Sequence, residues 1–125
     1  MGKFLSAEEV LNANDIVTEE VEVPEWGGSV LVRGLTALER DRFEASVIQG
    51  SGKNTTVKLE NARAKLASLT VVGEDGKRLF SQADVAKLSQ KSAAALNRIY
   101  NVAARLSGIT DEDLEEISQD FDGGQ

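Results

Sequence analysis

Residues 21–43 constrain the fold more than any other part of the chain. Two short runs of alternating apolar residues there flank Gly27 and Gly28. Consecutive glycines tolerate the positive φ angles of a tight turn, so the segment predicts a β-hairpin with this pair as its loop. In that register Val23 pairs with Val32. Because side chains alternate along a strand, one face of the predicted hairpin carries four valines: Val21, Val23, Val30 and Val32.

The opposite face of the predicted hairpin is mixed, with Glu22 paired to Arg33 beside an apolar group. That group consists of Pro24, Trp26 and Leu31. A four-residue loop would shift the register by an even number of residues and would leave both faces unchanged. Pro24 has no N–H to donate to a ladder, so its strand is predicted to be a sheet edge.

Helix starts are marked by one repeated pattern: an apolar residue, then Ser or Thr, then an acid three positions later. This is the pattern of a capping box, in which the two side chains bond each other's backbone N–H groups. The four capping pairs are Ser6 with Glu9, Thr36 with Glu39, Ser81 with Asp84, and Thr110 with Asp113. The pattern and the apolar periodicity predict helices over about residues 6–12, 36–48, 56–70, 81–88, 92–107 and 110–118.

Apolar residues at three- and four-residue steps mark the buried face of each longer helix. The predicted inward residues are Leu38, Phe43 and Val47; Leu59, Ala62, Leu66 and Leu69; and Ala93, Leu96, Ile99, Tyr100, Ala103 and Leu106. Gly108 is expected to end the helix of residues 92–107. Residues 49–54 are expected to be a flexible break, and residues 71–80 a small turn or ribbon that reverses at Asp75-Gly76.

These elements predict an α+β protein, an N-terminal β-hairpin packed on a small bundle of four to six helices. The valine face is expected to pack on the helix that starts at Thr36. The length suits a single domain over residues 1–119, and residues 120–125 are expected to form a disordered acidic tail.

The amino-acid composition excludes several kinds of catalytic and metal-binding site. The chain has no cysteine and no histidine, which removes disulfides, thiol nucleophiles, imidazole bases and the usual zinc ligands. We expect no cofactor and no metal. No signal peptide and no membrane-spanning run is visible, and the lack of cysteine suits a reducing cytoplasm.

Charge is distributed unevenly. Residues 1–25 carry one base and seven acids, a net charge of −6, and residues 110–125 carry seven acids and no base. Residues 26–109 carry thirteen bases and seven acids, a net charge of +6. The acidic ends are therefore expected to neutralise the basic middle within the fold. The total of −7 argues against nucleic acid as a partner.

Four segments superficially suggest catalytic or binding chemistry. Residues 50–55 resemble a phosphate-binding loop but lack its first Gly and the Ser or Thr after Lys53, so a linker is the better interpretation. Acids between Asp111 and Asp122 lack the spacing of a calcium loop and are interpreted as a solvated face. The pairs Glu19-Glu20 and Glu74-Asp75 have no third polar group to perturb their pKa values, so enzymatic function has little support.

Trp26 is the only tryptophan in the chain and lies at the tip of the predicted hairpin. The preferred interpretation is a cross-strand contact with Leu31 that covers the edge of the core. The alternative is an aromatic anchor for a partner protein. In that case the partner-binding patch is Pro24, Trp26 and Leu31.

Three segments carry a family resemblance. The order Val-Pro-Glu-Trp-Gly-Gly-x-Val-x-Val-Arg-x-Leu-Thr-x-x-Glu-Arg-x-x-Phe-Glu over residues 23–44 resembles the tail assembly chaperones of long-tailed bacteriophages. Residues 76–85 (Gly-Lys-Arg-Leu-Phe-Ser-x-Ala-Asp-Val) and 91–98 (Lys-Ser-Ala-Ala-Ala-Leu-x-Arg) are similar to the same family. The resemblance extends over about residues 5–116, and its motifs are structural rather than catalytic.

The resemblance implies a non-enzymatic chaperone that binds and solubilises the tape measure protein until tail tube subunits polymerise around it. It implies many copies along an extended helical partner, in the host bacterial cytoplasm, with none left in the mature virion. A frameshifted longer form would add contact with the tail tube protein, and self-association is compatible with this role. The alternatives are a structural tail or head–tail connector protein retained in the virion, a regulatory interaction module and, least favoured, an enzyme.

Overall fold

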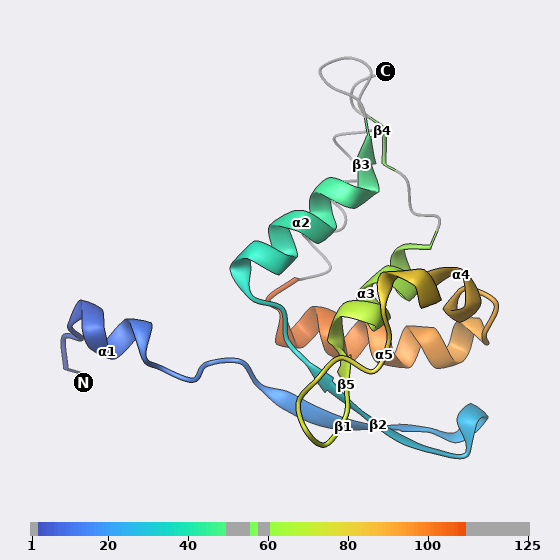
Figure 1. The fold of residues 1–125 in the computed structure, drawn as a ribbon, viewed down its shortest axis with the longest axis horizontal. Coiled ribbons are helices and arrows are strands. Elements are labelled where there is room, and N and C mark those ends of the chain that lie inside the picture. Colours follow the sequence, from blue (N-terminus) through green and yellow to red (C-terminus); the bar gives the residue numbers. More distant parts are fainter. Residues whose placement is uncertain (1–2, 50–55, 58–60, 110–125) are drawn as a thin grey trace.

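The computed structural model of the chain describes residues 3–49, 56–57 and 61–109. Its elements (Figure 1) are α1 (Ala7–Leu11), β1 (Thr18–Val23), the 3₁₀ turn η1 (Pro24–Trp26), β2 (Gly28–Arg33), α2 (Ala37–Val47), β3 (Ile48–Gln49), β4 (Thr56–Val57), α3 (Ala62–Thr70), β5 (Val71–Val72), the 3₁₀ turn η3 (Gln82–Asp84), α4 (Val85–Leu88) and α5 (Ala93–Leu106). The predicted α+β class is confirmed, with an N-terminal hairpin and five α-helices in the described part of the chain.

The hairpin is present, but its predicted register is wrong. Val23 lies opposite Gly28 instead of Val32, because the loop consists of residues 24–27 instead of the two glycines. Pro24 explains the change, since its fixed φ and missing N–H suit the first position of a 3₁₀ turn and not a ladder. Gly27 closes that turn at φ 75°, and its N–H donates to the carbonyl oxygen of Pro24 at 3.0 Å. The shift is even, so the predicted faces are retained.

The valine face of the hairpin lies in the core. Val21, Val23 and Val32 are buried, and the half-buried Val30 packs against them. The face packs mainly on α5, and the predicted packing on the helix after Thr36 is wrong. The reason is the amount of apolar surface that each helix offers. A broad inner face on α5 includes Leu96, Ile99 and Ala103, whereas α2 buries only Phe43 and Val47.

A third strand completes the sheet. β5 pairs antiparallel with β2, which places Val72 opposite Leu31 and leaves β1 as an edge, as predicted. The predicted ribbon of residues 71–80 is confirmed by a bridge between Val72 and Arg78, and Gly76 provides the reversal at φ 81°. The pairing of β5 with the hairpin was not predicted, because it joins segments that are far apart in the sequence.

The predicted capping boxes are confirmed at Ser6, Thr36 and Ser81. At Thr36 the hydroxyl accepts from the N–H of Glu39 at 3.2 Å, while the carboxylate of Glu39 accepts from the N–H of Thr36 at 2.9 Å. Gly108 follows α5 at φ 75°, as predicted. The box at Thr110, the helix of residues 110–118 and the tail of residues 120–125 lie outside the described residues, as do residues 50–54 of the expected break. Gln49, the first residue of that break, lies in β3.

The helix predicted over residues 56–70 is too long. It begins at Ala62, after Asn61 at φ 65°, and Thr56–Val57 instead form β4, which pairs with β3. β-branched residues at both positions favour extended backbone and outweighed the weak helical periodicity at this end. Leu59, one of the predicted inward residues, lies outside the described residues.

Most of the other residues that were predicted to face the core are confirmed to do so. Phe43, Val47, Ala62, Leu66, Leu96, Ile99 and Ala103 are buried, while Leu69, Tyr100 and Leu106 are half-buried. Leu38 and Ala93 are exposed, so both predictions are wrong. Leu38 and Ala93 lie in the first turns of α2 and α5. The apolar periodicity includes these turns, but the part of each helix that packs on the core begins later.

The end of the hairpin is fixed against the last turn of α5. Gly34 is buried there, and a Cβ at this position would lie 2.5 Å from the carbonyl oxygen of Leu106. The N–H of Leu35 donates to the hydroxyl of Ser107 at 2.9 Å. Only glycine allows this approach, which locks the sheet onto α5 at one end.

Val23→Asp is expected to lower the free energy of unfolding by about 4 kcal/mol or more, because it places an unpaired carboxylate in the core. Val23 is fully buried, whereas Val17, just before β1, is exposed. Val17→Asp is therefore the matched control and should change stability little. Urea denaturation measures both. Equal midpoints for the two variants would contradict the assignment of the hairpin faces.

Candidate interaction surface

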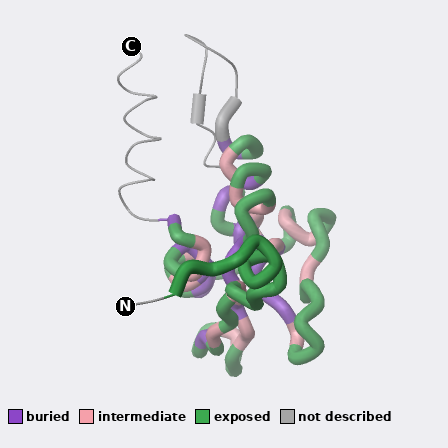
Figure 2. Tube along the Cα trace, turned by 90° about the vertical axis from the view of Figure 1, so that its left-hand side faces the viewer, coloured by how far each residue is buried: buried purple, intermediate pink, exposed green. Residues whose placement is uncertain are grey.

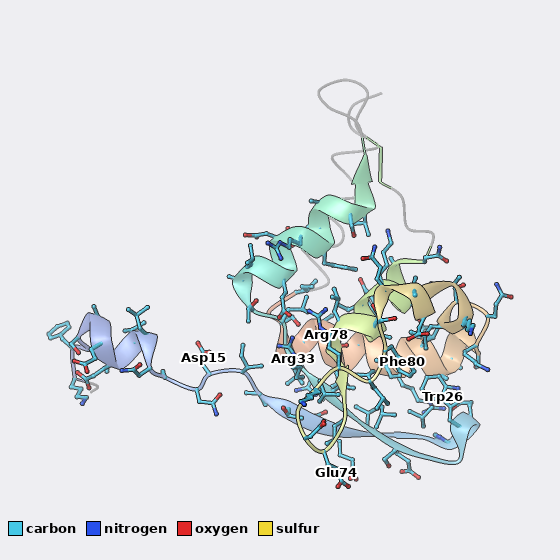
Figure 3. The ribbon with its side chains drawn as sticks, viewed as in Figure 1. Asp15, Trp26, Arg33, Glu74, Arg78 and Phe80 are labelled. Carbon is cyan, nitrogen blue, oxygen red and sulfur yellow. The ribbon has the colours of Figure 1, made fainter. Side chains whose placement is uncertain are left out.

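The three residues of the predicted partner-binding patch lie in two different elements and differ in exposure. Pro24 is exposed at the start of η1, and Leu31 is half-buried in β2, between Glu20 of β1 and Val72 of β5. Trp26 is half-buried and packs against the core at the tip of the hairpin (Figure 3). Trp26 belongs to the turn, and Leu31 pairs with Glu20, so Trp26 and Leu31 are not a cross-strand pair. The burial of Trp26 fits its predicted role as cover for the core edge. Whether the patch binds a partner stays a prediction.

Two ion pairs hold the hairpin to the outside of α5. Arg98 lies 3.2 Å from the carboxylate of Glu25 at the tip, and Arg105 lies 2.7 Å from that of Glu19 in β1. A backbone N–H together with the guanidinium of Arg98 lowers the pKa of Glu25. Acidic residues of the N-terminal segment therefore pair with the basic middle of the chain, as the charge distribution predicted.

A second electrostatic cluster joins three elements around Glu39, the third residue of α2. Arg33 of β2 and Arg78 of the ribbon, both labelled in Figure 3, each lie 2.7 Å from one carboxylate oxygen of Glu39. Burial by itself would raise the pKa of Glu39. Hydrogen bonds from Arg33, the N–H of Thr36 and Arg78 outweigh it and lower the pKa to about 2.

A carboxylate with so low a pKa stays ionised and fully engaged at neutral pH, so it is unsuited to proton transfer. We therefore interpret the Glu39 cluster as a clamp between the sheet, α2 and the ribbon. Sequence reasoning found Glu39 as a helix cap but missed its two arginine partners. Arg78 is 39 residues away along the chain, and no local pattern connects it to Glu39.

The two acidic pairs considered as catalytic candidates in the sequence each contribute a residue to a structural contact. Glu19 binds Arg105, and Asp75 accepts the N–H of Lys77 at 3.0 Å within the ribbon turn. Over residues 3–49, 56–57 and 61–109 no group of three His, Cys, Asp or Glu side chains gathers as metal ligands would. None of the helices in these ranges is long and apolar enough to cross a membrane. The segments 50–55 and 111–122 lie outside the described residues.

The largest exposed apolar group lies in the N-terminal arm, residues 3–17, which contains α1. Five large hydrophobic residues there are exposed: Phe4, Leu5, Val10, Leu11 and Val17. Among the other residues whose burial the structure describes, the exposed large hydrophobics are Leu38 and Leu79. The capping box predicted the helix of the arm, but sequence reasoning did not identify the arm as a surface.

One comparison with known proteins gives a match. A family model described as phage tail assembly chaperone matches residues 9–119. No curated protein and no solved structure matches the chain. The matched range includes the hairpin and all helices from α2 to α5, and it begins within α1.

The Glu39 clamp makes stability depend on pH. The folded pKa of about 2 lies below the ordinary value of 4.5, so the contribution is complete above about pH 4.5 and is lost as the pH falls toward 2. Because Glu39 is partly exposed, we expect Glu39→Gln to cost about 2 kcal/mol at neutral pH and much less near pH 2. Urea denaturation at both pH values measures this, with Glu22→Gln, on an exposed residue of β1, as the control. A cost for Glu39→Gln that is the same at both pH values would contradict the clamp.

Proposed function

The chain belongs to the phage tail assembly chaperone family, and from this membership we propose that it binds and solubilises the tape measure protein. Tail tube subunits would then polymerise around the tape measure protein and displace the chaperone. The observation that carries the proposal is the family match over residues 9–119, nearly the whole chain. We also propose that the protein acts by binding alone, without catalysis.

Two features of the described residues support a binding role. Apolar side chains are presented on the arm, where they are available to cover apolar residues of a partner. The carboxylates that lie beside cations, such as Glu19, Glu25 and Glu39, are occupied in ion pairs that hold the fold together. They support the body that carries the binding surface.

A chaperone that is later displaced needs modest contacts in each copy. Many weak apolar contacts along an extended helical partner would keep it soluble, and each would yield to a growing tube. The acidic residues of the N-terminal segment would steer the protein toward basic stretches of the partner. Binding would therefore weaken as salt screens these charges.

The site of action that we propose is the cytoplasm of the bacterial host, with the protein absent from the mature virion. A frameshifted extended form would bring the tail tube protein to the same complex. A structural tail or connector protein would instead remain in the particle. Mass spectrometry of purified virions separates the two roles, because peptides of this chain in stoichiometric amount would identify a structural component.

Co-expression with the tape measure protein of the same phage is expected to raise the soluble yield of that partner several-fold over an empty vector. The physical reason is that bound copies cover apolar surface that otherwise aggregates. Quantitative gel analysis of the soluble fraction measures the effect. The unfolding variant Val23→Asp should give no gain, which shows that the folded chain is required. Equal yields with wild type and with empty vector would contradict the proposed function.

The Pro24, Trp26 and Leu31 patch is tested in the same experiment with Trp26→Ala. Since Trp26 packs against the core, the melting temperature of this variant must first show that it is folded at the expression temperature. A folded Trp26→Ala that solubilises the partner as well as wild type does would remove Trp26 from the contact surface. It would leave the chaperone role itself intact.

A further inference from the structure

The outer side of β1 is the open edge of the sheet. In the described part of the chain the strand order is β1-β2-β5, so the opposite edge belongs to β5. That edge is closed by the ribbon, because the N–H of Leu79 donates to the carbonyl oxygen of Val71 at 3.0 Å. Among the described residues no strand pairs with the outer side of β1, which is six residues long. An unpaired edge of this length can accept a further strand from another chain.

The register of the hairpin decides which backbone groups face this open edge. An antiparallel strand bonds to one neighbour through every second residue, and the residues between them direct N–H and C=O to the other side. The carbonyl oxygen of Val17 accepts from the N–H of Gly34 at 3.0 Å, so the odd-numbered residues of β1 bond to β2. The even-numbered residues, Thr18, Glu20 and Glu22, therefore present their N–H and C=O groups at the edge. All three are exposed.

The N-terminal arm, which precedes β1, does not cover this edge. Figures 1 and 2 show the arm directed away from the body and exposed along its length. Its acids Glu8 and Asp15 are repelled by the glutamates of β1. Within the described part of the chain the edge is therefore open to another protein.

Charge selects a basic partner for the edge. The side chains of Glu20 and Glu22 lie on one face of β1 at a two-residue spacing, and neither has a partner among the described residues. Arg33, the cation on the same face of β2, is already held 2.7 Å from Glu39. The face therefore keeps two uncompensated negative charges. Two copies of β1 would repel each other edge to edge, whereas basic residues at alternate positions of an added strand would pair with both glutamates.

α5 sets the chemistry of the other face of an added strand. Arg98, Val102 and Arg105 follow the three- and four-residue spacing of one helix stripe. The two arginines bind Glu25 and Glu19 of the hairpin, so the half-buried Val102 lies beside β1 between these ion pairs. A strand added to β1 directs every second side chain toward this stripe. Apolar side chains fit there, because Val102 offers them a contact while the arginines repel basic ones.

We propose that β1 binds an extended segment of a partner protein in which basic and apolar residues alternate. The segment adds to the three-stranded sheet antiparallel to β1, the direction of both existing pairings. Its basic residues pair with Glu20 and Glu22, and its apolar residues lie against the stripe of α5. This contact goes beyond the proposed binding of the tape measure protein, since it requires an extended segment instead of a helical one and does not depend on that partner.

A peptide of sequence Val-Lys-Val-Lys-Val-Thr with blocked ends provides the test. Placed antiparallel to β1, its lysines lie opposite Glu22 and Glu20, and the lysine N–H groups are directed at the edge. The peptide is titrated at low salt into the isotope-labelled full chain and followed by two-dimensional NMR. We expect the largest shifts at the amides of Thr18, Glu20 and Glu22.

Two methylated forms of the peptide separate strand addition from simple charge attraction. Both carry the same charges. Methylation of the two lysine amide nitrogens removes donors that face β1 and should weaken binding about ten-fold. Methylation of two valine amide nitrogens, which face solvent, should change the affinity little.

A pair of protein variants tests the role of charge. Glu20→Gln/Glu22→Gln alters exposed side chains, so it should keep the wild-type stability. It should bind the peptide several-fold more weakly at low salt and equally at high salt. Glu8→Gln/Asp15→Asn removes the same charge from the arm and should bind as the wild type does.

The proposal fails on any of three results. Equal affinity of the two methylated peptides would show binding by charge without strand addition. Equal affinity of Glu20→Gln/Glu22→Gln and wild type, or shifts that leave the amides of β1 unchanged, would place the peptide elsewhere. The lack of any shift at millimolar peptide would show that the glutamates only guard the edge against pairing.

Discussion

Packing of the valine face of the hairpin against α5 is the interaction on which the rest of the structure depends. Val23, Val32 and Ile99 are completely buried where the sheet meets the helix. Burial of one such side chain contributes about 2 kcal/mol, a large share of the stability of a small domain. With this layer in place, the close approach of Gly34 to Leu106 and the outer ion pairs of α5 follow as attachments at its edges.

Ion pairs and strand pairing connect α2, the ribbon and β5 to the layer formed by the hairpin and α5. Glu39 links α2 to the sheet and to the ribbon, because one carboxylate receives both Arg33 and Arg78. β5 adds a third strand through its pairing with β2. Within the described residues the N-terminal arm is bonded to the body at Val17, and its large apolar residues are exposed. A body rigid enough to present an uncovered segment is what a binding protein requires, and it is consistent with membership of a chaperone family.

Interactions between residues close together in the sequence could be predicted, whereas pairings between distant segments could not. The caps at Ser6, Thr36 and Ser81 were predictable because all their partners lie within three residues. The faces of the hairpin were predictable because any even change of loop length preserves them, although Pro24 moved the register. The pairing of β5 with β2 and the pairing of Arg78 with Glu39 depend on contacts between distant segments that no local pattern encodes.

The location of the exposed apolar surface also could not be predicted from local sequence patterns. As the only tryptophan, beside two glycines, Trp26 was the candidate anchor, and the structure places it against the core. The helix of the arm was predicted from its cap, which does not indicate whether its apolar residues are covered. Leu5, Val10 and Leu11 have the same spacing whether a helix is covered or not, so exposure is decided by tertiary structure alone.

The central claim, a body built on the hairpin and α5 with an uncovered arm, is tested most directly by hydrogen exchange with mass spectrometry in dilute solution. The amides of Thr18–Val23, Gly28–Arg33 and Ala93–Leu106 should exchange slowest, and those of residues 3–16 should exchange nearly as fast as in an unfolded chain. Protection of the arm equal to that of α5 in dilute solution, or a hairpin that exchanges as fast as the arm, would contradict the account.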